Sequence, residues 1–187
     1  MNDTFFSPLP PIGIPASLNC QLAQLYISRR DAKAIKILHK LISTASRTGA
    51  IAESYHPVHK TGCDGQGHHL ESTAAMIQLI CNLFVQSSHE KIHLTPMIDK
   101  KWINAGKKIS VKNMTTHFGP ISFTLESSGT TLTLSLNPTF IRPPKSIEIS
   151  LPAPIDSITI NKKTQSINGL TAELSPDTTK ATLTLLA

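Results

Sequence analysis

The hydrophobic positions follow a helical period in the first half of the chain and a period of two in the second half. Leu18, Leu22 and Leu25 recur at helical spacing, which predicts a helix over residues 16–27. A second helix is predicted after Asp31 as its N-cap, with Gly49 closing it. A third, over about residues 69–85, is apolar around most of its circumference and therefore requires packing partners on most sides.

The second half is rich in serine and threonine, and apolar residues alternate there with polar ones. Ser127, Ser128 and Gly129 are expected to join two strands in a tight hairpin, with Leu132, Leu134 and Leu136 on one face. Prolines separate the other runs. Many short strands with regular turn signals favour an antiparallel β-sandwich. The predicted fold class is α+β, with a helical segment over residues 1–88 and a sandwich over 89–187.

Composition and charge restrict the partners. The chain of 187 residues carries a formal charge of +6, most of it in the second half as short lysine pairs without interleaved aromatic residues. Such pairs are typical of solvated turns and strand edges, so no nucleic acid is expected. The three cysteines lack CxxC spacing and indicate reduced thiols. Without a signal peptide or a membrane-length apolar stretch, we expect a cytoplasmic protein with no membrane partner.

Residues 53–71 concentrate the titratable groups of the first half. Four histidines, three carboxylic acids and three glycines lie in this segment, which suits a loop better than a core or a regular helix. One interpretation is an ordered connection whose histidines bond to the backbone. Another is a metal site, for which the competent ligands are His56, His59, Cys63, Asp64, His68 and His69. Because no helical His pair and no CxxC completes that set, neither a metal nor another cofactor is predicted.

The third interpretation is carbohydrate processing, in which one carboxylic acid protonates the glycosidic oxygen and a second carboxylate activates water or attacks the sugar. Glu53 and Glu71 flank the loop and could supply such a pair. Histidine and glutamine side chains suit hydrogen bonds to sugar hydroxyls.

Four segments resemble the six-hairpin, (α/α)6-barrel glycosidases. Residues 11–23 look like a late inner helix, and residues 49–57 and 62–69 look like the loop and Gly/His-rich turn that precede the last inner helix. Residues 102–123 look like part of the β-sandwich often appended to such barrels. The chain departs from the pattern in lacking an aromatic residue before Glu53, and in having Gln66 and Glu71 where an Asp and a Trp are expected.

The resemblance implies the final hairpins of an (α/α)6 toroid followed by a C-terminal β-sandwich. It implies a fragment or remnant of a glycoside hydrolase, acting on carbohydrate and without full activity alone. Glu53 and Glu71 are the catalytic candidates, and the substrate-binding candidates are His56, Asp64, Gln66, His68 and His69. A partner chain or a homo-oligomer would supply the missing helices. The alternatives are a non-catalytic carbohydrate-binding or protein-interaction module, and a metal-binding module through the histidine loop.

Overall fold

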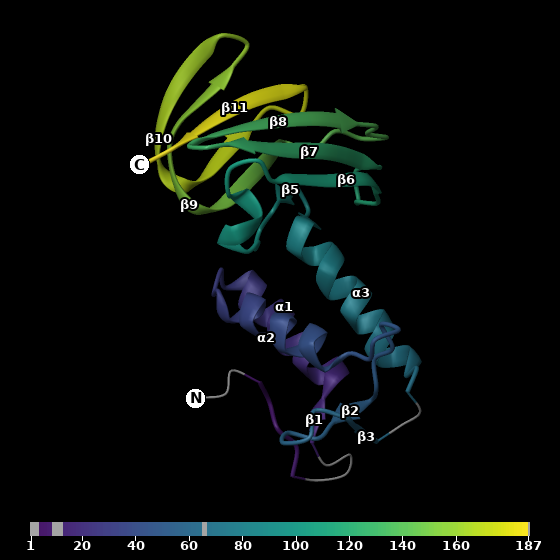
Figure 1. Cartoon of the computed structure of the whole chain (residues 1–187). Coiled ribbons are helices and arrows are strands. Elements are labelled where there is room, and N and C mark those ends of the chain that lie inside the picture. The colour runs from purple at the N-terminus through teal and green to yellow at the C-terminus, as the bar shows by residue number, and fades with distance from the viewer. Residues whose placement is uncertain (1–3, 9–12, 65–66, 187) are drawn as a thin grey trace. The chain divides into compact units, whose positions relative to one another are not determined.

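A computed structural model describes residues 4–8, 13–64 and 67–186 (Figure 1). These residues divide into two compact units, Met1–Asn82 and Leu83–Ala187. None of the helices among them is long and apolar enough to cross a membrane.

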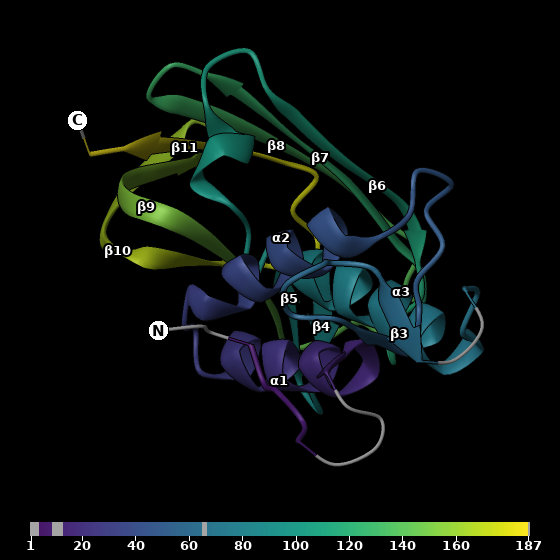
Figure 2. The same ribbon diagram turned by 60° about the horizontal axis from the view of Figure 1, so that its bottom comes forward.

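The first unit is built mainly on helices. It contains β1 (Ile14–Pro15), α1 (Ala16–Ser28), α2 (Lys33–Thr44), β2 (Ser54–Tyr55), β3 (Gly62–Asp64) and most of α3 (Leu70–Phe84). Helices α1 and α2 pack side by side (Figure 2), and the three short strands form one sheet in the order β1-β2-β3. The three predicted helices are confirmed. Helix α2 ends before Gly49, because the Thr44 hydroxyl bonds to the Leu41 carbonyl and Ala45 adopts extended backbone.

Helix α3 is apolar on its exposed side as well as its buried side. Met76, Leu79 and Leu83 are buried, whereas Leu70, Ile77 and Ile80 are exposed. The expectation that this helix needs further packing partners agrees with that exposure. A partner chain or a second copy that covers it stays a proposal.

The second unit is a single curled sheet. Its strands are β4 (Val85–Ser87), β5 (Lys91–Leu94), β6 (Lys108–Met114), β7 (Ile121–Ser128), β8 (Thr131–Pro138), β9 (Ser146–Ile160), β10 (Lys163–Leu174) and β11 (Lys180–Leu185). They run in the order β4-β5-β9-β11-β8-β7-β6, with β10 on the other edge of β9 (Figure 1). A 3-10 turn, η1 (Lys100–Ile103), lies between β5 and β6.

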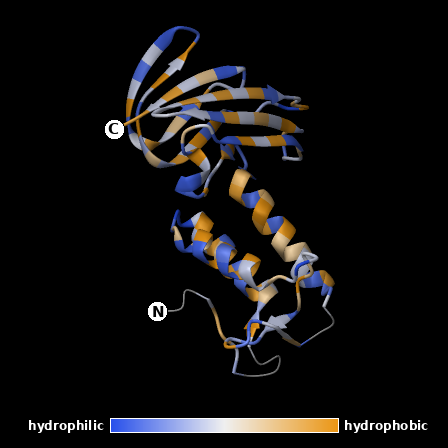
Figure 3. Ribbon diagram, viewed as in Figure 1, coloured by the Kyte–Doolittle hydropathy of each residue, from blue (hydrophilic) through white to orange (hydrophobic). Residues whose placement is uncertain are grey.

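Alternation of apolar and polar residues gives this sheet its core (Figure 3). Leu132, Leu134 and Leu136 of β8 are buried on one face, as predicted. The β7–β8 hairpin is tight, as predicted, but its turn lies at Gly129 and Thr130, because Ser127 and Ser128 are paired residues of β7. Aliphatic side chains dominate the core, with Phe118 and Phe123 as its buried aromatic residues among those described.

The predicted architecture of a helical toroid segment followed by a β-sandwich is wrong. The described residues hold three α-helices, and most of the remaining elements are strands of one nearly closed, barrel-like sheet. The error arises at β9, where Pro152 and Pro154 were taken to separate strands. They lie inside one 15-residue strand, which bends where proline cannot donate a ladder hydrogen bond.

Because β9 bends, its two ends pair with different strands of the sheet. Residues 146–149 pair in parallel with β5, and residues 155–159 pair with β11 on the same edge. Strand β10 follows the bend through bulges between Ser166 and Thr171. Asn161 and Lys162, both with positive φ, close the β9–β10 hairpin in two residues. The sheet therefore curls as one body, whereas a sandwich would consist of two sheets.

In the second unit, the backbone at Gly119 lies very close to the backbone of residues 139–141. Its φ is +120°, and an added Cβ would lie 2.6 Å from the Thr139 carbonyl oxygen and 2.9 Å from the Ile141 nitrogen. Gly119→Ala should lower the free energy of unfolding by about 3 kcal/mol, because backbone strain and a backbone clash combine. Gly129→Ala is the control, since Gly129 has open space around it and only a positive φ; it should cost about 1 kcal/mol. Fluorescence of the single tryptophan, Trp102, follows unfolding of this unit. Equal losses in the two variants would contradict the close approach.

Candidate functional site

The loop predicted as the site is anchored to the helical unit through backbone and buried side chains. The Glu53 carbonyl accepts a hydrogen bond from Ala16 N at 2.9 Å, and the buried Tyr55 hydroxyl accepts one from Ala52 N at 3.0 Å. Ser54 is fully buried between these contacts. The backbone of Glu53 is therefore fixed on both sides, while its side chain remains 35% exposed.

Glu53 and His69 are brought together by this anchoring. The Glu53 Oε2 lies 3.7 Å from His69 Nε2, within ion-pair range but longer than a hydrogen bond. The His69 Nδ1 accepts a hydrogen bond from Ser72 N at 3.3 Å and lies 3.0 Å from the Ser72 hydroxyl. This network assigns the ring proton of neutral His69 to Nε2, the nitrogen that faces the carboxylate.

His69 also fixes the start of α3. Its Nδ1 satisfies a backbone N–H in the first turn, where a helix lacks internal acceptors. Its own N–H donates to the Ile51 carbonyl at 2.9 Å and its carbonyl accepts from Thr73 N at 3.0 Å. The ring thus acts as a helix cap that at the same time orients Nε2 toward Glu53.

His56 makes local contacts of its own, and the remaining predicted residues that the structure describes are exposed. His56 Nδ1 accepts from the backbone of Val58 and His59, which closes a local turn with the two imidazole rings 4.6 Å apart. Asp64, His68 and Glu71 are exposed, and Gln66 lies outside the described residues. In the described part of the loop, no hydrogen bond or ion pair joins His68 or Glu71 to another predicted site residue. No group of three or more metal-ligating side chains occurs among the described residues.

A pocket that sequence reasoning missed lies in the second unit. Its volume is about 300 Å³, and it is lined by Phe84, Trp102, Lys107, Lys108, Ile109 and Ser110. The rings of Phe84 and Trp102 stack with centroids 5.7 Å apart and planes 21° apart. Both rings are half-buried, and both line the pocket. The lone tryptophan between two lysine pairs was the sequence signal for this site.

The turn that carries Lys107 is held by four hydrogen bonds. Gly106 N and Ser127 O lie 2.9 Å apart, as do Ser127 N and Lys107 O, and Lys107 N donates to the Asn104 carbonyl at 3.0 Å. The buried Ser127 hydroxyl donates to the Ile103 carbonyl at 2.7 Å. Ser127 at the end of β7 therefore ties the Asn104–Lys107 turn and the end of η1 to the sheet.

Positive charge surrounds this pocket unevenly. Lys108 Nζ lies 2.7 Å from Glu126 Oε1, and the hydrogen bond from Lys108 lowers the pKa of the Glu126 carboxyl below its usual value. Lys107 has no carboxylate partner among the described residues. The pocket thus has one paired and one unpaired ammonium group at its edge.

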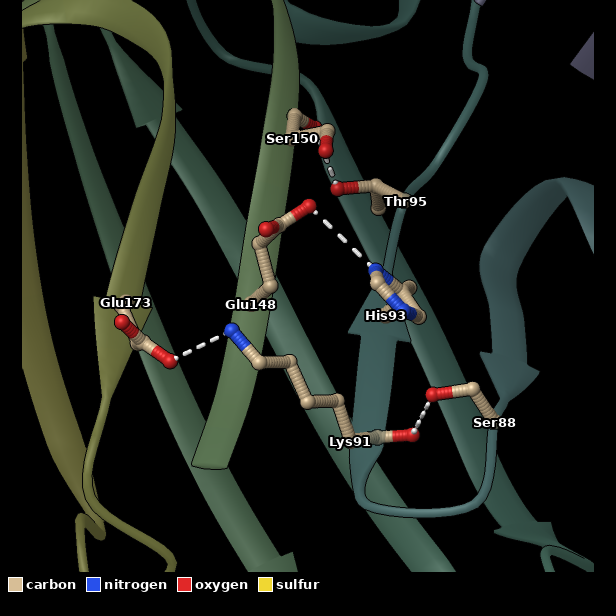
Figure 4. Close-up of polar contacts among 7 residues, drawn as sticks. All are labelled: Ser88, Lys91, His93, Thr95, Glu148, Ser150 and Glu173. Carbon is tan, nitrogen blue, oxygen red and sulfur yellow. Dashed lines mark hydrogen bonds and ion pairs between the residues drawn. The ribbon is translucent and has the colours of Figure 1, made fainter. Parts of the chain in front are cut away.

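A second polar cluster joins β5, β9 and β10 (Figure 4). His93 Nδ1 lies 3.3 Å from Glu148 Oε1, and Lys91 Nζ lies 2.8 Å from Glu173 Oε1. The Thr95 hydroxyl donates to the Ser150 carbonyl at 2.7 Å. These contacts connect residues 55 or more positions apart, so the sequence alone could not pair them. The His93 and Thr95 contacts link β5 and the residue after it to β9, and the Lys91 contact links β5 to β10.

Comparisons with known proteins give only distant structural likenesses. No protein-family model and no curated protein matches the chain. Among solved structures, it is similar to a GH127 β-L-arabinofuranosidase from Geobacillus stearothermophilus T6, with a TM-score of 0.47 and 11% sequence identity. The match covers 97% of this chain and 33% of that one, so the chain spans about a third of its length. The roles of individual residues rest on the geometry of this chain.

The capping role of His69 can be tested against its neighbour. His69→Ala should lower the free energy of unfolding of the helical unit by about 1 kcal/mol, because a first-turn N–H of α3 loses its acceptor. His68→Ala is the control, since His68 is exposed and has no hydrogen bond with another described residue. Thermal melts followed by the helical circular dichroism signal measure both. Equal stability of the two variants would show that His69 does not cap the helix.

Proposed function

We propose that this chain binds a carbohydrate without hydrolysing it, using the pocket of Phe84 and Trp102. The observation that carries the proposal is the stacked aromatic pair on the wall of a 300 Å³ pocket. A pyranose ring has a face of C–H groups that packs on an aromatic ring, and a rim of hydroxyls that bond to polar groups. The pocket volume is at the lower end of the range for small-molecule sites, which suits a single sugar ring.

The polar groups around the pocket fit the same ligand. Lys107, Lys108 and Ser110 supply N–H and O–H donors around an apolar floor to which Ile109 contributes. The Lys107 turn is fixed before any ligand arrives, so little conformational entropy is lost on binding. The resemblance of residues 11–125 to glycosidases supports carbohydrate as the ligand class.

The loop of Glu53 favours a chain that does not hydrolyse glycosides alone. Hydrolysis needs two carboxyl groups about 5–10 Å apart on either side of the bond. Glu53 is fixed by its backbone and faces His69, whereas Glu71 is exposed on the first turn of α3. One positioned carboxylate is insufficient for general acid–base work. Catalysis by Glu53 and Glu71 would therefore need groups from another chain.

Removal of the tryptophan ring should weaken sugar binding strongly. Trp102→Ala should weaken binding of the best oligosaccharide in a panel of neutral and acidic sugars about tenfold or more, measured by calorimetry, because the stacking surface is lost. Phe140→Ala is the matched control: Phe140 is also a half-buried aromatic residue of this unit but does not line the pocket. Its binding should equal that of the wild-type chain. Unchanged affinity in Trp102→Ala would refute the pocket as the sugar site.

The purified chain should not turn over aryl glycosides. We expect rates at the background level across α- and β-linked pyranosides and furanosides, since only one carboxylate is positioned. Glu53→Gln should be indistinguishable from the wild-type chain in the same assay. Robust turnover that disappears in Glu53→Gln would establish an independent enzyme and overturn the non-hydrolytic proposal.

A further inference from the structure

We propose that the ligand of the Phe84–Trp102 pocket is an anionic saccharide, whose carboxylate or sulfate group is bound by the ammonium group of Lys107. This inference rests on the proposed function and adds the charge of the sugar to it. The sugar ring would lie against the aromatic pair, and its anionic substituent would point toward the turn that ends at Lys107.

The first argument is the unpaired state of Lys107. Lys108, its neighbour, is paired with Glu126 at 2.7 Å, whereas Lys107 forms no ion pair with a described carboxylate. A lysine that lines a pocket without an acidic partner leaves a positive potential there. A neutral sugar would leave that potential uncompensated, and an anionic substituent would neutralise it.

The second argument is the rigidity of the Lys107 backbone. Its N–H and carbonyl are both hydrogen-bonded, to Asn104 O and from Ser127 N, and Gly106 beside it bonds to Ser127 O. The Lys107 side chain therefore extends from an ordered backbone position at the edge of the pocket. The backbone needs no further ordering on binding, and the remaining entropy cost is that of the Lys107 side chain.

The third argument concerns the neighbouring charges. Lys108 retains N–H donors beyond the one used by Glu126, so it can add a second contact to the same anionic group. Lys100 and Lys101 belong to η1, the element that carries Trp102, and Asp99 caps that element by accepting from Lys101 N at 2.9 Å. The chain around the tryptophan is thus basic on both sides.

The geometry favours a saccharide over a nucleic acid. The two rings stack on each other, so the pair presents a platform for one ring, whereas single-strand binding sites stack successive bases on several aromatic residues.

The test uses the fluorescence of Trp102, the only tryptophan of the chain, with ligands matched except for charge. The first pair is trigalacturonic acid and its methyl ester, and the second is a sulfated galactose disaccharide and its unsulfated form. We expect the better of the two acidic sugars to bind about tenfold more tightly than its neutral counterpart, with an affinity that falls as salt is added. The two pairs distinguish a carboxylate from a sulfate.

Lys107→Gln should weaken binding of the acidic sugar about fivefold and remove most of its salt dependence. It should weaken binding of the neutral counterpart less, because the glutamine amide keeps an N–H donor but removes the charge. Lys112→Gln is the matched control, because it removes an exposed charge from the same strand as Lys108 but outside the pocket lining. It should behave as the wild-type chain.

The possible results distinguish failure of the anionic-ligand inference from failure of carbohydrate binding itself. Equal affinity for acidic and neutral sugars would overturn the anionic ligand while leaving carbohydrate binding intact. No change of Trp102 emission with any of the four sugars, and none in calorimetry, would overturn both. Tighter binding of a single-stranded oligonucleotide than of any sugar would also overturn the inference, and would indicate that the ligand of the pocket is a nucleic acid.

Discussion

The bent strand β9 is the constraint on which the second unit depends. It pairs with β10 along most of its length, with β5 through residues 146–149 and with β11 through residues 155–159. Without the bend at Pro152 and Pro154, one edge of a strand could not serve two differently directed neighbours. The β4–β5 pair would then be separated from β11, the strand through which the β6–β7–β8 meander joins the sheet.

The pocket depends on the same strand through two routes. Strand β5 is fastened to β9 by backbone pairing and by the His93–Glu148 contact, and Thr95 just beyond β5 donates its N–H to the Phe84 carbonyl. From the other side, Ser127 at the end of β7 fixes the end of η1 and the Lys107 turn. Phe84 and Trp102 are thus held from two parts of one sheet, and their stacking follows from the curl of that sheet.

The sequence predicted local elements better than their assembly. Spacing of apolar residues located α1 and α3, and alternation located the face of Leu132, Leu134 and Leu136, because both signals depend on neighbours along the chain. The bend in β9 was missed, because proline usually ends a strand and only the partners of β9 show that it continues. The parallel β5–β9 pair has no local signal at all.

The same distinction holds for the candidate sites. The composition of the loop around Glu53 makes it stand out in the sequence. The β1-β2-β3 sheet and α3 bring the two ends of this segment together, which places Glu53 beside His69. His56 serves a local turn, and His68 and Glu71 are exposed. The pocket has no comparable sequence signal, because one tryptophan between two lysine pairs does not define an aromatic site. Phe84, which stacks on Trp102, is the last residue of α3, and that helix was predicted to belong to the helical segment over residues 1–88.

The parallel pairing of β5 with β9 imposes an order on folding. Strands β6, β7 and β8 form a meander of hairpins between neighbours in sequence, which closes only short loops. Strand β5 precedes that meander, but it can pair only when β9 is present, and β9 lies more than fifty residues later in the chain. During synthesis the β4–β5 hairpin therefore leaves the ribosome long before its site on the sheet exists, and the contact order of this unit is high. The aromatic pocket, which needs β5 in place, is among the last features of the unit to form.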